Sequence, residues 1–261
     1  DCLIESNKIE SGSVDLILTD LPYGTVKDIK NVKHGMSGKC EWDNILPTER
    51  IMQIANRILR KNGKMLLTAQ QPFTNELINK AIPNLPFSYC MIWEKDHFAN
   101  ALIAKKAPLN YYEDILVFSK THDHEGLHPL RPYFKNVLDF IGLKKKDIIE
   151  KIGQNADHVL RVNSTQFSLC TEKTYLKLIE VFNIDKLNEF KTFKELKEIE
   201  FKYESRFNLW ENNKHKSNIL KYKKDYDGHH PTQKPVLLLE DLIKTFSNKN
   251  EAFDYLQQYH F

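Results

Sequence analysis

A buried β-strand that ends in a proline-stiffened turn is the feature of this sequence that most constrains its fold. Residues 13–19 (SVDLILT) form a short, mostly apolar and branched run, and residues 20–24 (DLPYG) follow directly. Such a run is typical of a strand inside a sheet. Because Pro22 pushes Leu21 out of helical geometry, the Leu21 carbonyl can point outward beside Asp20. The pattern predicts a carboxylate and an aromatic ring at the carboxyl edge of a sheet, where open α/β folds bind ligands.

The next hundred residues alternate between helix-like and strand-like patterns. We expect helices over residues 47–60, closed by Asn62-Gly63 as a C-cap, and 74–81, and strands over 64–68, 87–93 and 112–118. This order predicts an α/β fold with part of a doubly wound sheet and a closing hairpin.

A change of composition predicts a helical insert. Residues 131–226 are rich in Lys, Glu and Asn, with expected helices at 144–152, 154–161, within 164–182, and in the charged stretch 186–203. An apolar helix over 236–246 follows, with Pro235 near its start. We therefore divide the chain into an α/β part (1–130), the insert (131–226) and a return to the first part (227–261).

Composition excludes several other classes of protein. The chain has only 9 Gly and contains no G-x-G-x-x-G, P-loop or G-x-S-x-G pattern. No apolar run approaches the roughly 20 residues that span a membrane. The four widely spaced Cys indicate reduced thiols in a cytoplasmic protein. The net charge of +3 means that any basic surface is local.

The DLPY turn suits one kind of ligand. The Asp20 carboxylate and the Leu21 carbonyl form a pair of acceptors beside the flat ring of Tyr23. Such a pair fits a planar base whose exocyclic amino group donates to the acceptors while its face stacks on the ring. Taken alone, the motif also fits a strand-to-loop turn with a surface tyrosine.

Several motifs in order resemble the S-adenosylmethionine-dependent DNA amino-methyltransferases, which methylate adenine N6 or cytosine N4. The resemblance is strongest to the permuted class common in phage and restriction-modification systems. It rests on residues 13–24, 41–43 (EWD), 71–73 (QPF), 93–95 (WEK), 113–118 and especially 229–235 (HHPTQKP). It implies a partial Rossmann-like methyltransferase sheet with a helical inserted target-recognition region.

The resemblance also implies a reaction and its residues. A methyl group passes from S-adenosyl-L-methionine to the amino group of a base flipped out of double-stranded DNA, with adenine N6 preferred to cytosine N4, and no metal is needed. The implied catalytic residues are Asp20, Leu21, Pro22 and Tyr23. The implied cofactor-binding residues are Asp1, Asp20, Thr232, Gln233, Lys234 and Pro235.

Two departures from the family pattern leave alternatives open. Leu21 replaces the first proline of the usual D-P-P-Y tetrad, which is tolerable because the family uses the backbone carbonyl there. The family pattern is lost at about Glu251, before the glycine-rich cofactor motif, so we expect a truncated chain. The alternative is a catalytically inactive DNA-binding remnant; a weaker one is an RNA or protein methyltransferase.

Two groups of polar side chains are candidates for DNA contact. The insert resembles a helix-turn-helix and carries Lys144, Lys145, Lys146, Arg161, Ser164, Thr165 and Gln166. Lys105 and Lys106 lie nearer the proposed active edge. The alternative for the insert is a helical subdomain with a solvated basic face. His122, His124 and His128 lack ligand spacing for a metal, so we expect a loop of exposed histidines.

Overall fold

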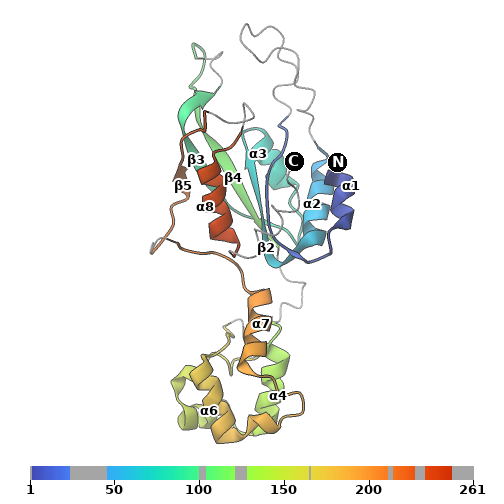
Figure 1. The fold of residues 1–261 in the computed structure, drawn as a ribbon, viewed down its shortest axis with the longest axis vertical. Coiled ribbons are helices and arrows are strands. Elements are labelled where there is room, and N and C mark those ends of the chain that lie inside the picture. The colour runs from blue at the N-terminus through green and yellow to red at the C-terminus, as the bar shows by residue number, and fades with distance from the viewer. Residues whose placement is uncertain are drawn as a thin grey trace. The chain divides into compact units, whose positions relative to one another are not determined.

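The protein consists of two compact units. The computed structural model describes residues 2–23, 46–99, 104–120, 128–164, 166–210, 214–226 and 233–248. Unit 1 comprises Asp1–Thr121 and Ser205–Phe261, and unit 2 comprises His122–Glu204 (Figure 1). We expected the insert to extend to residue 226. The difference arises because residues 219–221 form a strand in the sheet of unit 1, so the segment after residue 204 returns to it.

A five-stranded mixed sheet forms the centre of unit 1. Its strands are β1 (Val14–Asp20), β2 (Leu59–Ala69), β3 (Phe87–Ala99), β4 (Asn110–Ser119) and β5 (Ile219–Lys221), in the order β1-β2-β4-β3-β5. The pairs β1–β2 and β3–β5 are parallel, whereas β2–β4 and β3–β4 are antiparallel. The expected α/β class and closing hairpin are therefore confirmed.

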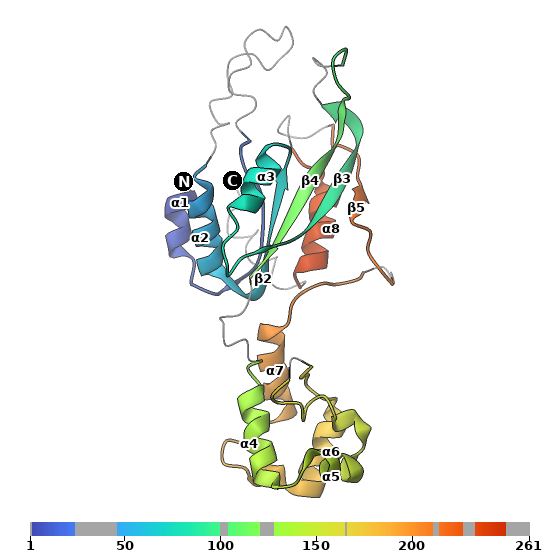
Figure 2. The same cartoon turned by 180° about the vertical axis from the view of Figure 1, so that it is seen from behind.

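Helices cover both faces of this sheet. Helices α2 (Thr48–Ile58) and α3 (Phe73–Asn79) pack on one face, and α8 (Val236–Phe246) packs on the other (Figures 1 and 2). A short helix, α1 (Cys2–Glu5), lies beside α2. Met52 of α2 and Leu242 of α8 are fully buried, so each face has its own apolar layer. None of the described helices is long and apolar enough to span a membrane.

The predicted C-cap at Asn62-Gly63 is wrong. Helix α2 ends at Ile58, and β2 begins at the next residue, so both residues lie inside the strand. A Cβ atom at Gly63 would lie 2.9 Å from the Arg60 carbonyl oxygen and 3.1 Å from that of Asp15. The glycine is therefore required by the close approach of two backbone segments, not by a helix terminus.

Unit 2 is helical, as the composition predicts, but its elements differ in detail. It contains α4 (Arg131–Ile141), α5 (Lys145–Ile152), α6 (Glu172–Phe182), α7 (Phe193–Tyr203) and two short 3₁₀ turns, Gln154–Ala156 and Ile184–Lys186. The second helix expected over 154–161 is only the first of these turns. The segment thus lacks the second α-helix that a helix-turn-helix requires directly after α5.

The helices of unit 2 enclose a separate aromatic core. Phe134 and Tyr175 are fully buried, and the hydroxyl oxygens of Tyr133 and Tyr175 lie 2.5 Å apart. Local sequence signals set the helix ends: Thr192 forms a capping box with Glu195 at the start of α7. With a core of its own, unit 2 has the organisation of an inserted domain.

The described residues of 205–226 contain no helix, contrary to the expectation for the end of the insert. Residues 208, 210 and 216 of this segment contact α8 or the residue after it through hydrogen bonds. Asn208 donates from its side-chain nitrogen to the carbonyl oxygens of Lys244 and Ser247, at 3.1 and 2.8 Å. Trp210 donates from Nε1 to Oδ1 of the buried Asp241 at 3.0 Å. The segment therefore fixes the helix whose first residues adjoin the candidate site.

Candidate active site

The candidate site lies at one edge of the sheet, where the chain leaves β1. Asp20 is the last residue of β1, and its register partner in β2 is Thr68. Because β4 runs antiparallel to β2, the start of β4 reaches the same edge: Ala69 pairs with Asp114. The turn predicted from the sequence is thus at the carboxyl edge of the parallel pair, as expected.

Three side chains hold the Asp20 carboxylate. The Tyr23 hydroxyl donates to Oδ1 at 2.9 Å, and the Thr68 hydroxyl donates to the same oxygen. Lys234 donates from Nζ to Oδ2 at 2.8 Å. The Asp20 side chain nevertheless remains 36% exposed, so a ligand can reach it.

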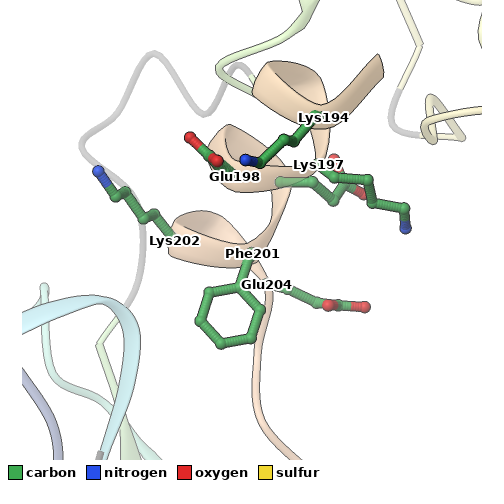
Figure 3. A pocket seen from close by; sticks show the side chains of 7 residues that line it. Lys194, Lys197, Glu198, Phe201, Lys202 and Glu204 are labelled. Atoms are coloured by element: carbon green, nitrogen blue, oxygen red, sulfur yellow. The ribbon is translucent and has the colours of Figure 1, made fainter. Parts of the chain in front are cut away.

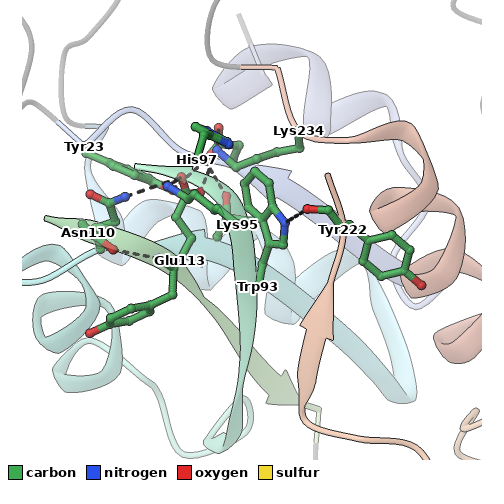
Figure 4. Close-up of polar contacts among 12 residues, drawn as sticks. Tyr23, Trp93, Lys95, His97, Asn110, Glu113, Tyr222 and Lys234 are labelled. Carbon is green, nitrogen blue, oxygen red and sulfur yellow. Dashed lines mark hydrogen bonds and ion pairs between the residues drawn. The ribbon is translucent and has the colours of Figure 1, made fainter. Parts of the chain in front are cut away.

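Lys234 joins distant parts of the chain. It lies 214 positions after Asp20 in the sequence, just before α8, and its side chain is only 9% exposed. Its Nζ also lies 3.0 Å from Oε2 of Glu113 (Figure 4). Burial of the ammonium acts to lower the pKa of Lys234, but the Glu113 and Asp20 carboxylates outweigh it, so the pKa is raised. Lys234 therefore remains a cation at neutral pH.

Glu113, which contacts Lys234, also forms a buried ion pair with Lys95. Glu113 of β4 contacts Lys95 of β3, with 2.6 Å between Oε1 and Nζ, and their side chains are 10% and 3% exposed. The Lys95 ammonium lies 5.3 Å from the ring of Trp93, which donates from Nε1 to the Tyr222 carbonyl oxygen at 2.8 Å. Glu113 and Lys95 fall within the segments that carry the family resemblance, but nothing in the sequence pairs them.

The other residues of the tetrad are partly or fully buried. The Leu21 side chain is 7% exposed and packs with the core beneath α2 and α3. The Tyr23 ring lies 5.7 Å from the ring of Phe73 and 5.8 Å from Lys234 Nζ. Burial, reinforced by the charges of Asp20 and Glu113, raises the pKa of Tyr23 far above its usual range. Its hydroxyl is therefore a permanent donor to Asp20.

This arrangement can bind and orient a hydrogen-bond donor. A carboxylate offers about four acceptor positions on its two oxygens. Because two hydroxyls occupy Oδ1 of Asp20, an incoming N–H meets Oδ2, next to Lys234. No group of three His, Cys, Asp or Glu side chains placed to hold a metal ion was found in the described part of the chain.

The predicted DNA-contact residues of unit 2 are only partly available at its surface. Lys145 Nζ lies 2.5 Å from Asp157 Oδ1, and Arg161 pairs with the other oxygen of the same carboxylate. Hydrogen bonds from these two cations lower the pKa of Asp157, and Lys145 has the larger effect. Arg161 also donates to the Gln166 side chain, and the Gln166 backbone N–H donates to Ser164 Oγ at 3.1 Å. One acidic residue thus offsets two of the predicted phosphate contacts.

The remaining predicted site residues have different environments. Lys144 and Lys146 at the start of α5 are exposed, as are Lys105 and Lys106 in unit 1. Gln233 and Pro235 flank Lys234 and are half-buried and buried. Other predicted site residues and motif segments lie outside the described residues: Asp1, Gly24, Thr165, residues 41–43 and residues 229–232, which include Thr232.

His128 is not the exposed loop residue that we expected. Its ring lies 4.9 Å from that of Phe167 and 4.5 Å from that of Tyr203, and its Nε2 is 3.0 Å from Glu200 Oε2. It is a packed residue of unit 2. His122 and His124 lie outside the described residues. A surface hollow along α7 is lined by charged side chains and Phe201 and contains none of the predicted site residues (Figure 3).

The Asp20 carboxylate lies at the carboxyl edge of an α/β sheet, the position at which open α/β folds bind ligands. The family model described as DNA methylase, for the N6/N4 methyltransferases, matches residues 14–253. The chain therefore belongs to the N6/N4 DNA methylase family, a family of enzymes. No relative was matched among curated proteins.

Solved structures of similar proteins were also found. A crystal structure of M1.HpyAVI with SAM is 15% identical, with 95% of this chain and 74% of that chain covered and a TM-score of 0.43. A protein of Thermus thermophilus described as a DNA modification methylase, complexed with S-adenosyl-L-methionine, is 13% identical. There 70% of this chain and 73% of that chain are covered, with a TM-score of 0.33.

Proposed function

We propose that this protein transfers a methyl group from S-adenosyl-L-methionine to the exocyclic amino group of a base flipped out of double-stranded DNA. Adenine N6 is the preferred target over cytosine N4, and the protein belongs to the permuted, site-specific class. The observation that carries the proposal is the accessible Asp20 carboxylate, held by Tyr23 and Lys234 at the sheet edge. Family membership thus agrees with a site that can accept hydrogen bonds from an amino group.

The residues around Asp20 fit the proposed cofactor chemically. When bound, S-adenosyl-L-methionine supplies an activated methyl group on a positively charged sulfur. The Asp20 and Glu113 carboxylates balance the charges of Lys234 and Lys95, so these four side chains carry no net positive charge that would repel a sulfonium. Gln233, Lys234 and Pro235 directly precede α8, where the resemblance expects the amino-acid end of the cofactor. Asp1 and Thr232 remain predictions for the same ligand.

The chain's own residues prepare the acceptor nitrogen. The lone pair of an exocyclic amino group is conjugated into the base, which makes the nitrogen a poor nucleophile. Hydrogen bonds from its two hydrogens to Asp20 Oδ2 and to the Leu21 carbonyl favour a more tetrahedral nitrogen with a freer lone pair. The Tyr23 ring and the Pro22 turn hold the base plane, and this alignment supplies much of the remaining rate. The base must leave the duplex to reach them.

Unit 2 is the proposed target-recognition region. Its exposed Lys144 and Lys146 present positive charge that suits DNA phosphates, whereas Lys145 and Arg161, proposed for the same role, are paired with Asp157. Ser164, Thr165 and Gln166 are side-chain types that contact phosphates and base edges. Lys105 and Lys106 of unit 1 are proposed as additional phosphate contacts.

The proposal is tested with cofactor binding and methyl transfer. Isothermal titration measures binding of S-adenosyl-L-methionine, and a tritiated cofactor measures transfer to unmethylated duplex DNA. Asp20→Ala is expected to abolish transfer while duplex affinity stays within about twofold, because the only part of the DNA that Asp20 is proposed to contact is the flipped base. Glu49→Ala, which truncates an exposed carboxylate paired with Lys80, is the matched control and is expected to be fully active.

The outcomes separate the alternatives. Transfer by the wild type that disappears only in Asp20→Ala supports the proposal. Transfer by Asp20→Ala at the wild-type rate would refute the acceptor role of the carboxylate. Duplex binding without any cofactor binding would instead support the inactive DNA-binding alternative. Methylation of RNA or protein in preference to duplex DNA would reassign the substrate.

A further inference from the structure

The charge arrangement around Asp20 raises a problem for an incoming amino group. Oδ1 already accepts hydrogen bonds from Tyr23 and Thr68, so the accessible acceptor is Oδ2. That oxygen lies 2.8 Å from Lys234 Nζ. A cation at this position competes with the base for the oxygen and draws electron density away from any nitrogen bound there.

Glu113 offers the same ammonium a second partner. Its Oε2 lies 3.0 Å from Lys234 Nζ, so the ammonium is shared between the two carboxylates. Oε1 of Glu113 is in turn fixed by Lys95 at 2.6 Å, and the Lys95 side chain is only 3% exposed. One carboxylate is accessible and the other is buried and anchored, so the lysine can be withdrawn toward the anchored one.

We propose that Glu113 is a positioning residue for the methyl-transfer site, and that Lys234 moves from Asp20 toward Glu113 when the amino group of the target base takes its place on Asp20 Oδ2. This inference rests on the proposed function. Glu113 acts through Lys234: by binding the ammonium it leaves Asp20 Oδ2 available to the amino group. Burying the Lys95–Glu113 pair carries a desolvation penalty that can exceed the attraction between the two charges. Holding Lys234 gives this pair a role beyond stabilising the fold.

The test compares Glu113→Gln with Glu49→Gln, which removes the same charge from the exposed pair with Lys80. Because Glu113→Gln leaves Lys95 without its buried partner, a double variant, Lys95→Met with Glu113→Gln, removes both members of the pair. The double variant is expected to recover stability. The double variant still lacks the second carboxylate for Lys234, so it should remain impaired in methyl transfer if Glu113 acts through that lysine.

The first measurement uses the free protein and needs no activity. In a chain with ¹⁵N-labelled lysine, the Lys234 ammonium signal is assigned from its loss in Lys234→Arg. The signal is expected to shift in both Asp20→Asn and Glu113→Gln and to stay in place in Glu49→Gln. A Lys234 signal that does not shift in Glu113→Gln would show that the ammonium is not shared between Asp20 and Glu113. This result would hold whether or not the protein is an active methyltransferase.

The second measurement is single-turnover methyl transfer to duplex DNA with binding measured separately. We expect a roughly tenfold slower transfer step in Glu113→Gln and in the double variant, the effect of weakening one charge-assisted hydrogen bond. Dissociation constants for cofactor and DNA stay within about twofold. Wild-type transfer by the stable double variant would overturn the inference, as would a matching loss of cofactor affinity. Absence of transfer in the wild type would refute the proposed function alone, and the ammonium signal would still decide the shared position.

Discussion

Removing the charge of Asp241 is expected to loosen the attachment of α8, the helix that follows Lys234. Asp241 is 2% exposed, and its carboxylate accepts from Trp210 Nε1 at 3.0 Å and from Lys216 Nζ at 2.5 and 2.7 Å. The Lys216 side chain is 14% exposed. Asp241→Asn therefore leaves a largely buried ammonium without its counter-charge.

The neighbouring residue provides the control. Glu240 pairs with Lys244 at 2.6 Å, but both side chains are about half exposed. Breaking a buried pair by removing one partner costs about 3–5 kcal/mol; because Lys216 retains some access to water, we expect about 3 kcal/mol. Glu240→Gln is expected to cost about 0.3–0.5 kcal/mol, as for an exposed helix pair.

The assay is urea unfolding followed by tryptophan fluorescence. Residues 122–204 contain no tryptophan, so the signal reports on unit 1, and Trp210 itself contacts Asp241. In thermal unfolding followed by the same fluorescence, at roughly 2–4 °C per kcal/mol for a domain of this size, the melting temperature should fall by about 6–12 °C in Asp241→Asn. Equal stability of Asp241→Asn and Glu240→Gln would refute the view that this buried pair fastens the segment to α8.

Three further predictions follow from other sites. Gly63→Ala should destabilise unit 1 by about 1–3 kcal/mol, because the new Cβ meets backbone oxygens at 2.9 and 3.1 Å; unchanged urea unfolding would contradict this. Asp157→Asn should strengthen DNA binding and steepen its salt dependence by releasing Lys145 and Arg161, whereas an unchanged slope would show that neither contacts phosphate. Because the Tyr23 pKa is raised, any stability from its neutral hydroxyl is complete below about pH 10 and is lost progressively as the pH rises from there through the higher folded value. Ultraviolet difference titration against Tyr23→Phe checks this, and a Tyr23 that ionises near pH 10 would contradict it.

Local patterns were enough to predict the elements that carry the site. The branched run before DLPY predicted β1 to within one residue at each end, and the apolar stripe after Pro235 predicted α8 over the observed Val236–Phe246. Both signals come from neighbouring residues in the sequence. The positions of Asp20 and Tyr23 at the sheet edge follow from the end of β1 and were therefore predictable as well.

Contacts between distant residues were not predictable. The pairing of Lys95 with Glu113 depends on the β3–β4 register, and the contact of Lys234 with Asp20 joins residues 214 positions apart. Asp157 neutralises two predicted DNA contacts only because its turn folds back on α5. Strand β5 is three residues long, too short for a periodic signal. These features depend on tertiary packing, which overrides local propensity.

In the proposed function, Asp20 prepares the amino group of a DNA base to accept a methyl group. The most direct measurement is mass spectrometry of nucleosides released from duplex DNA after incubation with S-adenosyl-L-methionine and either wild type or Asp20→Asn. We expect N6-methyladenine, or N4-methylcytosine, with the wild type, and a loss of about 100-fold or more with the variant. A methyl group on a ring carbon or ring nitrogen, or equal product from both proteins, would contradict it.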